Sequence, residues 1–400
     1  MSVALRLLPP PIQLRDVPEP RWDHLFRLSD DTGLLEHARN AIPRREHGYC
    51  VDDVSRGLLV AAREPRPTPE LTRLAERYLT FLTHAQSSTA QSLTAQSLTD
   101  QSLTDRSLTD RGVAGGFRNR MSYDRRWQDE PSLGDWWGRA LWGLGTAAAR
   151  ARSPWLRREA ANAFRHGVRC RSPWSRAMAF AGLGAAEVLR ADPHDREAAQ
   201  LLGDAATVIG LPGSDPDWVW PERKLTYANP ALAEVVIAAG DLLGDEGLLT
   251  DGLRMLAWLC RVQEHRGHLS PVPVCGWTAG EPRNRLTAHS LDDGTAASGV
   301  LDQQPVEVAA TADACATAAA VTGDERWDAP LFQAIAWFLG DNDTGTVMWD
   351  SETCGCYDGL TVDGPNLNQG AESTLALVST LQHARRLTSR SATRPSGGLA

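Results

Sequence analysis

The 400-residue sequence has no stretch long and apolar enough to span a bilayer, and it has no excess of positive charge. Lysine and arginine number 41 against 50 aspartates and glutamates, which gives a formal net charge of −9. A nucleic-acid-binding protein normally presents a basic face. The start of the chain has early prolines and only a weak basic region, unlike a secretion signal. We therefore predict a cytoplasmic protein with no membrane span and no nucleic-acid partner.

The sequence also lacks the residue spacings that hold metals, disulfide frameworks or nucleotides. Its seven cysteines are an odd number and lie scattered, and the one close pair, Cys354 and Cys356, has no histidine at ligand spacing. His265 and His268 stand three residues apart without a further ligand nearby. No glycine-rich turn follows a strand-like run. We predict free thiols, no metal and no cofactor.

Phenylalanine and tyrosine are scarce, at 7 and 5 residues, but tryptophan occurs 14 times. Tryptophan combines a broad apolar face with a hydrogen-bond donor, which suits stacking on sugar rings, although most buried tryptophans are core residues. Their positions along the chain must therefore decide between the two roles.

The stretch from Gly134 to Gly145, GDWWGRALWGLG, indicates a buried helix with its polar groups gathered at its start. Glycine is a poor helix former. Its frequency here is explained by close packing against neighbouring helices. An acid, two tryptophans and an arginine in the first turn suggest a site at that end.

The same arrangement recurs along the chain, because amphipathic helices alternate with apolar helices six times. The apolar helices are expected at 54–63, 135–148, 174–190, 231–243, 305–321 and 371–384, and the amphipathic ones at 33–41, 71–85, 154–169, 196–209, 246–262 and 327–339. Loops before the apolar helices are mostly long and carry the acids, arginines and tryptophans. Antiparallel hairpins with this bias place the long loops on one face. We predict an all-α (α/α)6 toroid with little or no sheet, whose inner helices begin around a central cup.

Domain boundaries follow from composition. Residues 1–21 are proline-rich and are expected to form an extended N-terminal arm. Residues 22–388 form the single toroid domain. The five-residue repeat TAQSL-TAQSL-TDQSL-TDRSL within 87–112 is polar and matches neither helix nor strand, so we expect a solvated insertion there. Residues 389–400 are expected to be a disordered tail.

Several sequence blocks resemble the six-hairpin (α/α) toroid superfamily of glycosidase-like enzymes. More narrowly, they resemble bacterial proteins encoded beside, or fused to, glycosyltransferases and near β-mannoside phosphorylases. The blocks are GYCVDD at 48–53, MSYD at 121–124, Asp135 with GRALW at 138–142, WPE at 220–222 with LTY at 225–227, DQQP at 302–305 and NQGAEST at 368–374. The resemblance implies a carbohydrate substrate and a functional association with a glycosyltransferase.

Glycoside cleavage needs two carboxyl groups flanking one bond, one of them protonated. Crowding among carboxylates raises a pKa and keeps one proton near neutral pH. The catalytic candidates are Asp53, Asp135, Asp302, Glu372, Glu222 and Glu307. Glu222, in a loop between aromatic residues, suits the acid role. For any one of these acids, helix capping or an ion pair is the more common explanation, but the set as a whole exceeds what capping requires. The substrate-binding candidates are Asp52, Arg118, Asn119, Trp127, Trp136, Arg139, Trp220, Tyr227, Trp277, Gln303, Gln304 and Asn368.

Three functions stay open. The first is a glycoside hydrolase acting on a short oligosaccharide, with a mannoside among the candidates. The second is a sugar epimerase or isomerase of the toroid type, which uses inner-helix histidines as acid and base. His24, His37, His84, His166, His194 and His383 are expected away from the cup, and only His47, His265, His268 and His289 lie in or beside rim loops. None of them begins an inner helix. The third is a non-catalytic carbohydrate-binding partner of a glycosyltransferase.

Overall fold

The computed structural model describes residues 12–87, 113–280 and 301–392. In this part of the chain twelve α-helices form two concentric rings, and the strands are short. The predicted (α/α)6 toroid is confirmed. No helix among the described residues has the length and apolar character needed to cross a membrane.

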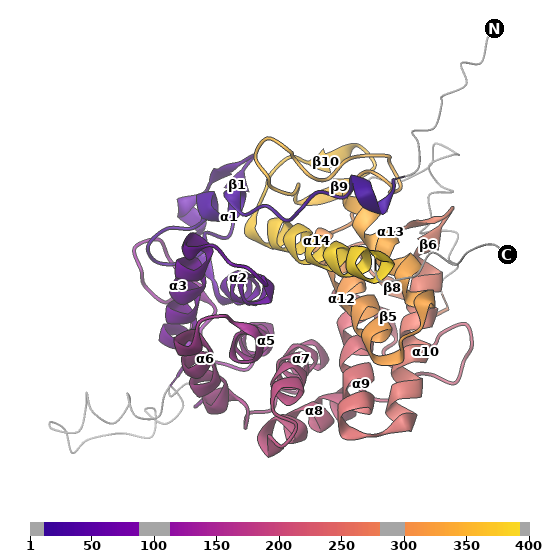
Figure 1. Cartoon of the computed structure of the whole chain (residues 1–400), viewed down its shortest axis with the longest axis horizontal. Helices are drawn as coiled ribbons and strands as arrows, with labels where there is room; N and C mark the ends of the chain where they lie inside the picture. The colour runs from indigo at the N-terminus through magenta and orange to yellow at the C-terminus, as the bar shows by residue number, and fades with distance from the viewer. Residues whose placement is uncertain (1–11, 88–112, 281–300, 393–400) are drawn as a thin grey trace, which may run out of the picture.

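The inner ring consists of six helices that pack side by side. They are α2 (Val51–Arg63), α5 (Asp135–Arg150), α7 (Ser175–Ala191), α9 (Asn229–Leu243), α12 (Pro305–Thr322) and α14 (Ala371–Ala392). Each contacts the next, and α14 contacts α2 to close the ring (Figure 1). Most residues of these helices are buried, which explains why their sequences are apolar almost all round. The last helix continues eight residues beyond the predicted range 371–384.

The outer ring covers the inner one and is amphipathic. Its helices are α3 (Pro69–Ala85), α6 (Pro154–Gly167), α8 (Arg196–Ile209), α10 (Glu246–Gln263), α13 (Asp328–Phe338) and the short α1 (Asp23–Leu28). Four of them begin at a side-chain cap, in which Thr68, Ser153, Asp195 or Asp245 accepts a hydrogen bond from the backbone three residues on.

Glycines allow the inner helices α5 and α7 to approach closely. A Cβ atom at Gly138 would lie 2.1 Å from the carbonyl oxygen of Ala177, and one at Gly145 would lie 2.3 Å from that of Gly184. The glycine-rich stretch therefore serves helix-on-helix packing, as its sequence predicts.

The predicted helix at 33–41 is absent. The side chain of Asp30 accepts hydrogen bonds from the backbone nitrogens of Thr32 and Gly33, which turns the chain. A hairpin of β1 (Ala38–Arg39) and β2 (Ile42–Pro43) follows, and then η2 (Arg45–His47). The outer-ring helix that precedes the inner helix α2 is therefore only the short α1.

The remaining strands pair in two-stranded sheets within the loops. The pairs are β3 (Tyr49–Cys50) with β4 (Arg120–Met121), β5 (Lys224–Leu225) with β8 (Trp277–Thr278), β6 (Glu264–His265) with β7 (His268–Leu269), and β9 (Gly359–Thr361) with β10 (Gly364–Asn366). Short 3-10 turns lie at η1 (Leu14–Asp16) and η5 (Glu325–Trp327).

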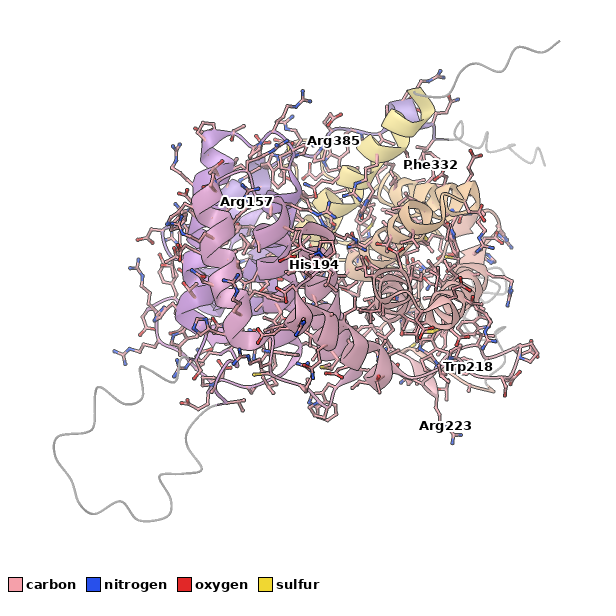
Figure 2. The ribbon with its side chains drawn as sticks, turned by 60° about the horizontal axis from the view of Figure 1, so that its bottom comes forward. Arg157, His194, Trp218, Arg223, Phe332 and Arg385 are labelled. Atoms are coloured by element: carbon pink, nitrogen blue, oxygen red, sulfur yellow. The ribbon has the colours of Figure 1, made fainter. Side chains whose placement is uncertain are left out.

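The long loops that precede the inner helices gather at one end of the toroid. Arg223, in the loop before α9, projects from that end, whereas Arg385, late in α14, lies at the opposite end (Figure 2). The predicted repeat insertion, apart from residue 87, lies outside the described residues, and so do residues 1–11 of the predicted arm and 393–400 of the predicted tail. Residues 389–392 of that tail belong to α14.

Candidate active site

A cavity of about 1010 Å³ opens at the end of the toroid where the inner helices begin. All six inner helices contribute residues from their first turns or from the positions just before them. The lining residues are Glu36, His37, Cys50, Asp52, Asp53, Arg56, Asn119, Arg120, Gly134, Asp135, Trp136, Arg139, Trp174, Ser175, Arg176, Glu222, Thr226, Tyr227, Gln304, Val306, Asp358, Gly370, Glu372 and Ser373. The cavity is thus the predicted cup.

The first turn of α2 supplies two neighbouring carboxyl groups, Asp52 and Asp53. Neither caps the helix, because the N-cap residue is Cys50 and no capping side chain is present. Asp53 is 3% exposed, and its Oδ1 lies 2.7 Å from Nη1 of Arg56. Burial raises the pKa of Asp53 to about 7. Arg56 and the Cys50 thiol, which lies 3.6 Å from Oδ2, thus contact the two oxygens of this carboxyl group.

Asp52 lies in a different environment. Its side chain is 19% exposed, and its partner among the described residues is Arg139, whose Nε lies 3.5 Å from Oδ1. Burial raises the pKa of Asp52, and the nearby carboxylates of Asp135 and Glu372 add to this effect, while Arg56 and Arg139 oppose it. Asp52 is thus a cavity-facing carboxyl that holds its proton more strongly than an ordinary aspartate.

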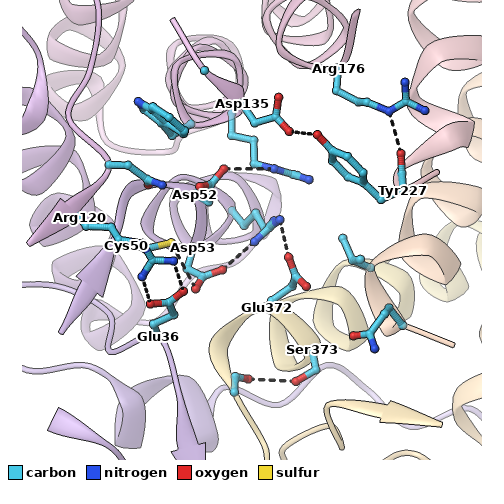
Figure 3. A pocket seen from close by; sticks show the side chains of 18 of the residues that line it. Glu36, Cys50, Asp52, Asp53, Arg120, Asp135, Arg176, Tyr227, Glu372 and Ser373 are labelled. Atoms are coloured by element: carbon cyan, nitrogen blue, oxygen red, sulfur yellow. Dashed lines mark hydrogen bonds and ion pairs between the residues drawn. The ribbon is translucent and has the colours of Figure 1, made fainter. Parts of the chain in front are cut away.

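Arg56 connects α2 to α14. Its Nη1 contacts Asp53, and its Nη2 lies 2.6 Å from Oε2 of Glu372. Beside Glu372, Ser373 donates a hydrogen bond of 2.5 Å to Asp358. Figure 3 shows Asp52, Asp53, Asp135 and Glu372 around the same cavity. Four of the predicted carboxyl groups are therefore brought together by three helices.

Asp135, the first residue of α5, accepts a hydrogen bond from the hydroxyl group of Tyr227. Burial, together with this hydrogen bond, raises the pKa of Tyr227, so the phenol stays protonated and remains a donor. Asp135 is thus oriented from the opposite wall of the cavity.

A second ion pair, between Arg176 and Glu222, forms the wall on the side of α7. Nη1 of Arg176 lies 2.5 Å from Oε1 of Glu222, and Nη2 donates to Asn229. Asn229 in turn donates to Glu307 at 2.8 Å. Glu222 is thus held in an ion pair with Arg176, and its predicted role as proton donor stays a prediction.

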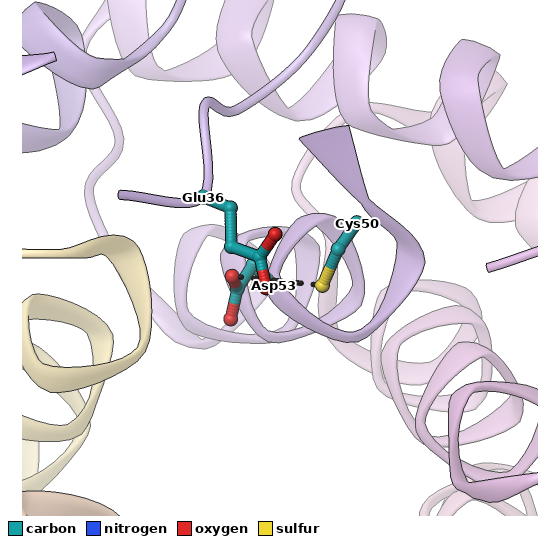
Figure 4. Close-up of side chains that lie close together, drawn as sticks. All are labelled: Glu36, Cys50 and Asp53. Atoms are coloured by element: carbon teal, nitrogen blue, oxygen red, sulfur yellow. Dashed lines mark hydrogen bonds between the residues drawn. The ribbon is translucent and has the colours of Figure 1, made fainter. Parts of the chain in front are cut away.

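Glu36, Cys50 and Asp53 form a compact cluster (Figure 4). One ligand-type atom from each lies within 4.8 Å of the others, so the three could contact one metal ion. However, both oxygens of Glu36 accept hydrogen bonds from Arg120, at 2.5 and 3.0 Å, and Asp53 is paired with Arg56. Burial also raises the pKa of the Cys50 thiol well above its usual range, which disfavours the thiolate that binds metals. The cluster is an ion-pair network, and we assign no metal to it.

Ten of the predicted site residues line the cavity: Asp52, Asp53, Asp135, Glu222, Glu372, Asn119, Trp136, Arg139, Tyr227 and Gln304. Two predicted catalytic acids do not. Asp302 accepts a hydrogen bond from Gln304 at 2.9 Å and lies behind it. Glu307 is buried behind Asn229, and burial raises its pKa to about 7. Both were expected in the cup because they lie beside the start of α12, but their side chains do not reach it.

Six predicted binding residues also lie outside the cavity lining. Trp220 is buried and stacks on Trp258, and Trp277 is buried beside β5. Trp127 packs against Phe81, with Arg118 over its ring. Gln303 donates to Asp343, and Asn368 accepts from the backbone of Asn40. Packing contacts or hydrogen bonds within the loops explain the positions of these side chains.

Fourteen of the 24 lining residues were not predicted from the sequence, and four of them are charged or aromatic side chains whose omission has an identifiable reason. Arg56 and Arg176 are charged residues within apolar helices, and that isolation was the available signal. His37 was expected on an outer helix but lies in the loop that replaces it. Trp174 was counted as the start of an apolar helix, yet it is 66% exposed at the rim.

Among the histidines in rim loops, the ring of His47 packs edge-to-face against that of His37, with ring centroids 4.8 Å apart. His265 and His268 belong to the β6–β7 hairpin and do not line the cavity, and His268 pairs with Asp343. His289 lies outside the described residues. The cavity therefore holds one lining histidine, His37, within the described ranges.

The sequence matches no protein-family model and no curated protein. Solved structures with a similar fold include a sugar epimerase from a ruminal bacterium, with a TM-score of 0.60 and 13% identity over 91% of this chain and 95% of that one. A cellobiose 2-epimerase from Spirochaeta thermophila has a TM-score of 0.59 and 13% identity over 92% and 93%. A GH76 α-mannanase from Bacteroides thetaiotaomicron has a TM-score of 0.56 and 10% identity over 92% and 94%. These similarities establish the shared toroid fold.

Proposed function

We propose that the protein is a carbohydrate-active enzyme, a glycoside hydrolase that cleaves a short oligosaccharide, with a mannoside among the candidate substrates. The observation that carries the proposal is the convergence of carboxyl groups from the first turns of α2, α5 and α14 on one open cavity. The solved structures with this fold include enzymes named for sugars, which supports a carbohydrate substrate.

Asp52 is the proposed proton donor. Its raised pKa keeps a proton available, and the one ion pair of its carboxyl group among the described residues is with Nε of Arg139, 3.5 Å away. A glycosidic oxygen in the cavity can therefore approach it. Asp53, the first choice from the sequence, becomes a positioning residue, because it is buried and holds Arg56.

Asp135 is the proposed base or nucleophile. The Tyr227 hydrogen bond orients its carboxylate, and a general base or nucleophile must be ionised to act. The two carboxyl groups come from adjacent inner helices and face one space. Trp136, Trp174 and Tyr227 line the same cavity and supply apolar faces for sugar rings.

The test is a screen of short oligosaccharides for release of reducing sugar, followed by the substitutions Asp52→Asn and Asp135→Asn. Each substitution is expected to lower kcat/KM by at least about a hundredfold, since acid–base groups contribute roughly 10²–10⁴. Asp302→Asn is the matched control and is expected to retain most of the activity. Full activity in both cavity variants would refute the assignment.

A second candidate is a sugar epimerase or isomerase, favoured by the position of His37. Its ring lines the cavity, and its Nε2 lies 3.6 Å from Oε1 of Glu36. A histidine can move a proton at a sugar carbon near neutral pH. Exchange of a substrate hydrogen with D₂O, lost in His37→Gln, would support this candidate. Linkage cleavage without exchange would exclude it.

The third candidate is a non-catalytic partner of a glycosyltransferase. This candidate predicts that the protein binds a glycan measurably and that no product assay detects turnover. Co-purification with a glycosyltransferase would support the association, which rests on the sequence resemblance.

A further inference from the structure

Beneath the cavity, on the axis of the toroid, lies a second and smaller space that we call the apolar chamber. Its volume is about 50 Å³, and all six inner helices contribute to its lining. Leu59, Trp142, Phe180, Ala231, Ala310 and Leu375 supply apolar walls, and the polar residues Asp313 and Ser379 also line the chamber. Alanine in place of larger residues leaves this space open at the centre of the ring.

The chamber borders the cavity through shared side chains. Arg56, Arg139, Val306 and Glu372 line both spaces. A ligand bound in the cavity therefore has access to the chamber only between these groups. The chamber is too small for a sugar ring, since ligand pockets measure about 300–1,000 Å³. It has room for a substituent of a few heavy atoms.

The shared boundary also carries two buried arginines, and one of them has a donor without an acceptor. Arg139 is only 6% exposed, its guanidinium lies 3.9 Å from the ring centroid of Phe180, and its Nε pairs with Asp52. The Nε atom of Arg56 is buried and has no hydrogen-bond partner among the described residues. A buried donor without an acceptor is costly, so a bound ligand is expected to supply one.

These two properties identify the chemistry of the substituent. Apolar walls favour a methyl group, and empty apolar volume destabilises a fold until it is filled. The Nε donor of Arg56 at the mouth requires an acceptor oxygen. A carboxylate or phosphate would also accept, but the carboxylates of Asp135 and Glu372 lie near Arg139 and disfavour a further negative charge.

Resting on the proposed function, we infer that the substrate is an acylated sugar. The methyl group of an acetyl substituent enters the apolar chamber, and its carbonyl oxygen accepts a hydrogen bond from Nε of Arg56. The substituent can be attached through nitrogen or through oxygen, because both forms present the same methyl and carbonyl groups.

The experiment measures binding rather than turnover, so that it stands apart from the hydrolase assay. Isothermal titration calorimetry compares N-acetylmannosamine with mannose, N-acetylglucosamine with glucose, and 6-O-acetylmannose with mannose. At least one acetylated sugar is expected to bind about tenfold more tightly than its parent. A preference for an N-acetyl sugar would identify the substituent as an amide, and a preference for 6-O-acetylmannose would identify it as an ester.

The substitution Ala310→Leu fills the chamber and is expected to abolish that preference. Ala320→Leu is the matched control, because Ala320 is exposed on the same helix, and it is expected to keep the preference. Thermal unfolding checks that each variant is folded, and Ala310→Val replaces the leucine if that variant is not.

Two results would overturn the inference. In the first, no acetylated sugar binds more tightly than its parent, even if oligosaccharides are hydrolysed, which leaves the proposed function intact. In the second, Ala310→Leu raises the unfolding temperature without changing the binding ratio, which makes the chamber an unfilled void. A retained acetyl preference without hydrolysis would support the inference and count against the proposed function.

Discussion

Tyr227 donates a hydrogen bond to Asp135, and this contact joins the loop before α9 to the first turn of α5 across 92 residues of sequence. It links two walls of the cavity that meet only through side chains. The hydroxyl group of Tyr227 therefore fixes the orientation of the carboxylate that we propose as base or nucleophile.

Replacing Tyr227 by phenylalanine removes this hydrogen bond and keeps the ring. We expect kcat to fall about tenfold with little change in KM, since a hydrogen bond to a charged group contributes roughly 1.5–3 kcal/mol. Steady-state kinetics on the cleaved oligosaccharide measure both constants. Tyr123→Phe, at an exposed tyrosine outside the cavity lining, is the control. An unchanged kcat in Tyr227→Phe would show that Asp135 needs no such orientation.

Trp174 is the most exposed tryptophan of the cavity rim. Its substitution by alanine is expected to raise KM three- to tenfold while kcat changes little, because aromatic stacking contributes about 0.5–1.5 kcal/mol. Trp155→Ala serves as the comparison, since Trp155 is 44% exposed on the outer helix α6. Equal effects of the two substitutions would remove Trp174 from the binding site.

Gly138→Ala tests the packing of α5 on α7. The added Cβ would meet the carbonyl oxygen of Ala177 at 2.1 Å, so the free energy of unfolding is expected to fall by about 1–3 kcal/mol. Gly203→Ala, within α8, meets only Leu243 Cδ1, at 3.6 Å. That variant is expected to be neutral or stabilised by about 0.5–1 kcal/mol. Denaturant titration of both proteins measures the difference, and equal stabilities would contradict the packing argument.

Glu234 makes stability depend on pH. It is buried in α9, its Oε1 accepts from Thr317, and burial raises its pKa from 4.5 to about 8. The folded state therefore favours the protonated form. Its contribution is complete below about pH 4.5 and is lost as the pH rises towards about 8.

Thermal unfolding across this range provides the measurement. The unfolding temperature of Glu234→Gln is expected to decline less steeply with rising pH than that of the natural protein. Glu352→Gln, at an exposed turn, is expected to follow the natural protein. If the unfolding temperatures of all three proteins depend on pH in the same way, Glu234 is not the group that causes the pH dependence.

The fold was predictable from sequence because its two signals are local. The inner helices are apolar on nearly every face, and glycines such as Gly138 mark where they touch. The outer helices keep one polar face. The exception, at residues 33–41, has helical spacing of apolar residues, but the turn made by Asp30 overrides it. Periodicity alone does not reveal such a turn.

The site was predictable in location but only partly in detail. Proximity to an inner-helix start selected Asp52, Asp135 and Glu372, and all three line the cavity. The same criterion wrongly placed Asp302 and Glu307 in the cavity lining, because the direction of a side chain at a loop–helix junction depends on partners far away in sequence. Glu307, for example, is turned towards Asn229, 78 residues earlier.

Two arginines that line the cavity show the same limit of prediction from sequence, because they are site residues that were not predicted. Arg56 and Arg176 do not stand in acid-rich loops, so a search for such loops passes over them. Their roles follow only from the carboxylates they bind, Glu372 and Glu222, which come from other parts of the chain. A lone charge inside an apolar helix is the signal that would have found them.

The central claim is that the cavity at the start of the inner helices binds a glycosidic bond between Asp52 and Asp135. A crystal structure of the Asp52→Asn variant with an intact oligosaccharide tests it most directly. The account predicts the glycosidic oxygen within hydrogen-bond distance of residue 52, with the Asp135 carboxylate beside the adjoining anomeric carbon. The distance between the two side chains would then distinguish a retaining from an inverting enzyme. An oligosaccharide bound elsewhere on the protein, or in the cavity with its linkage remote from both residues, would contradict the account.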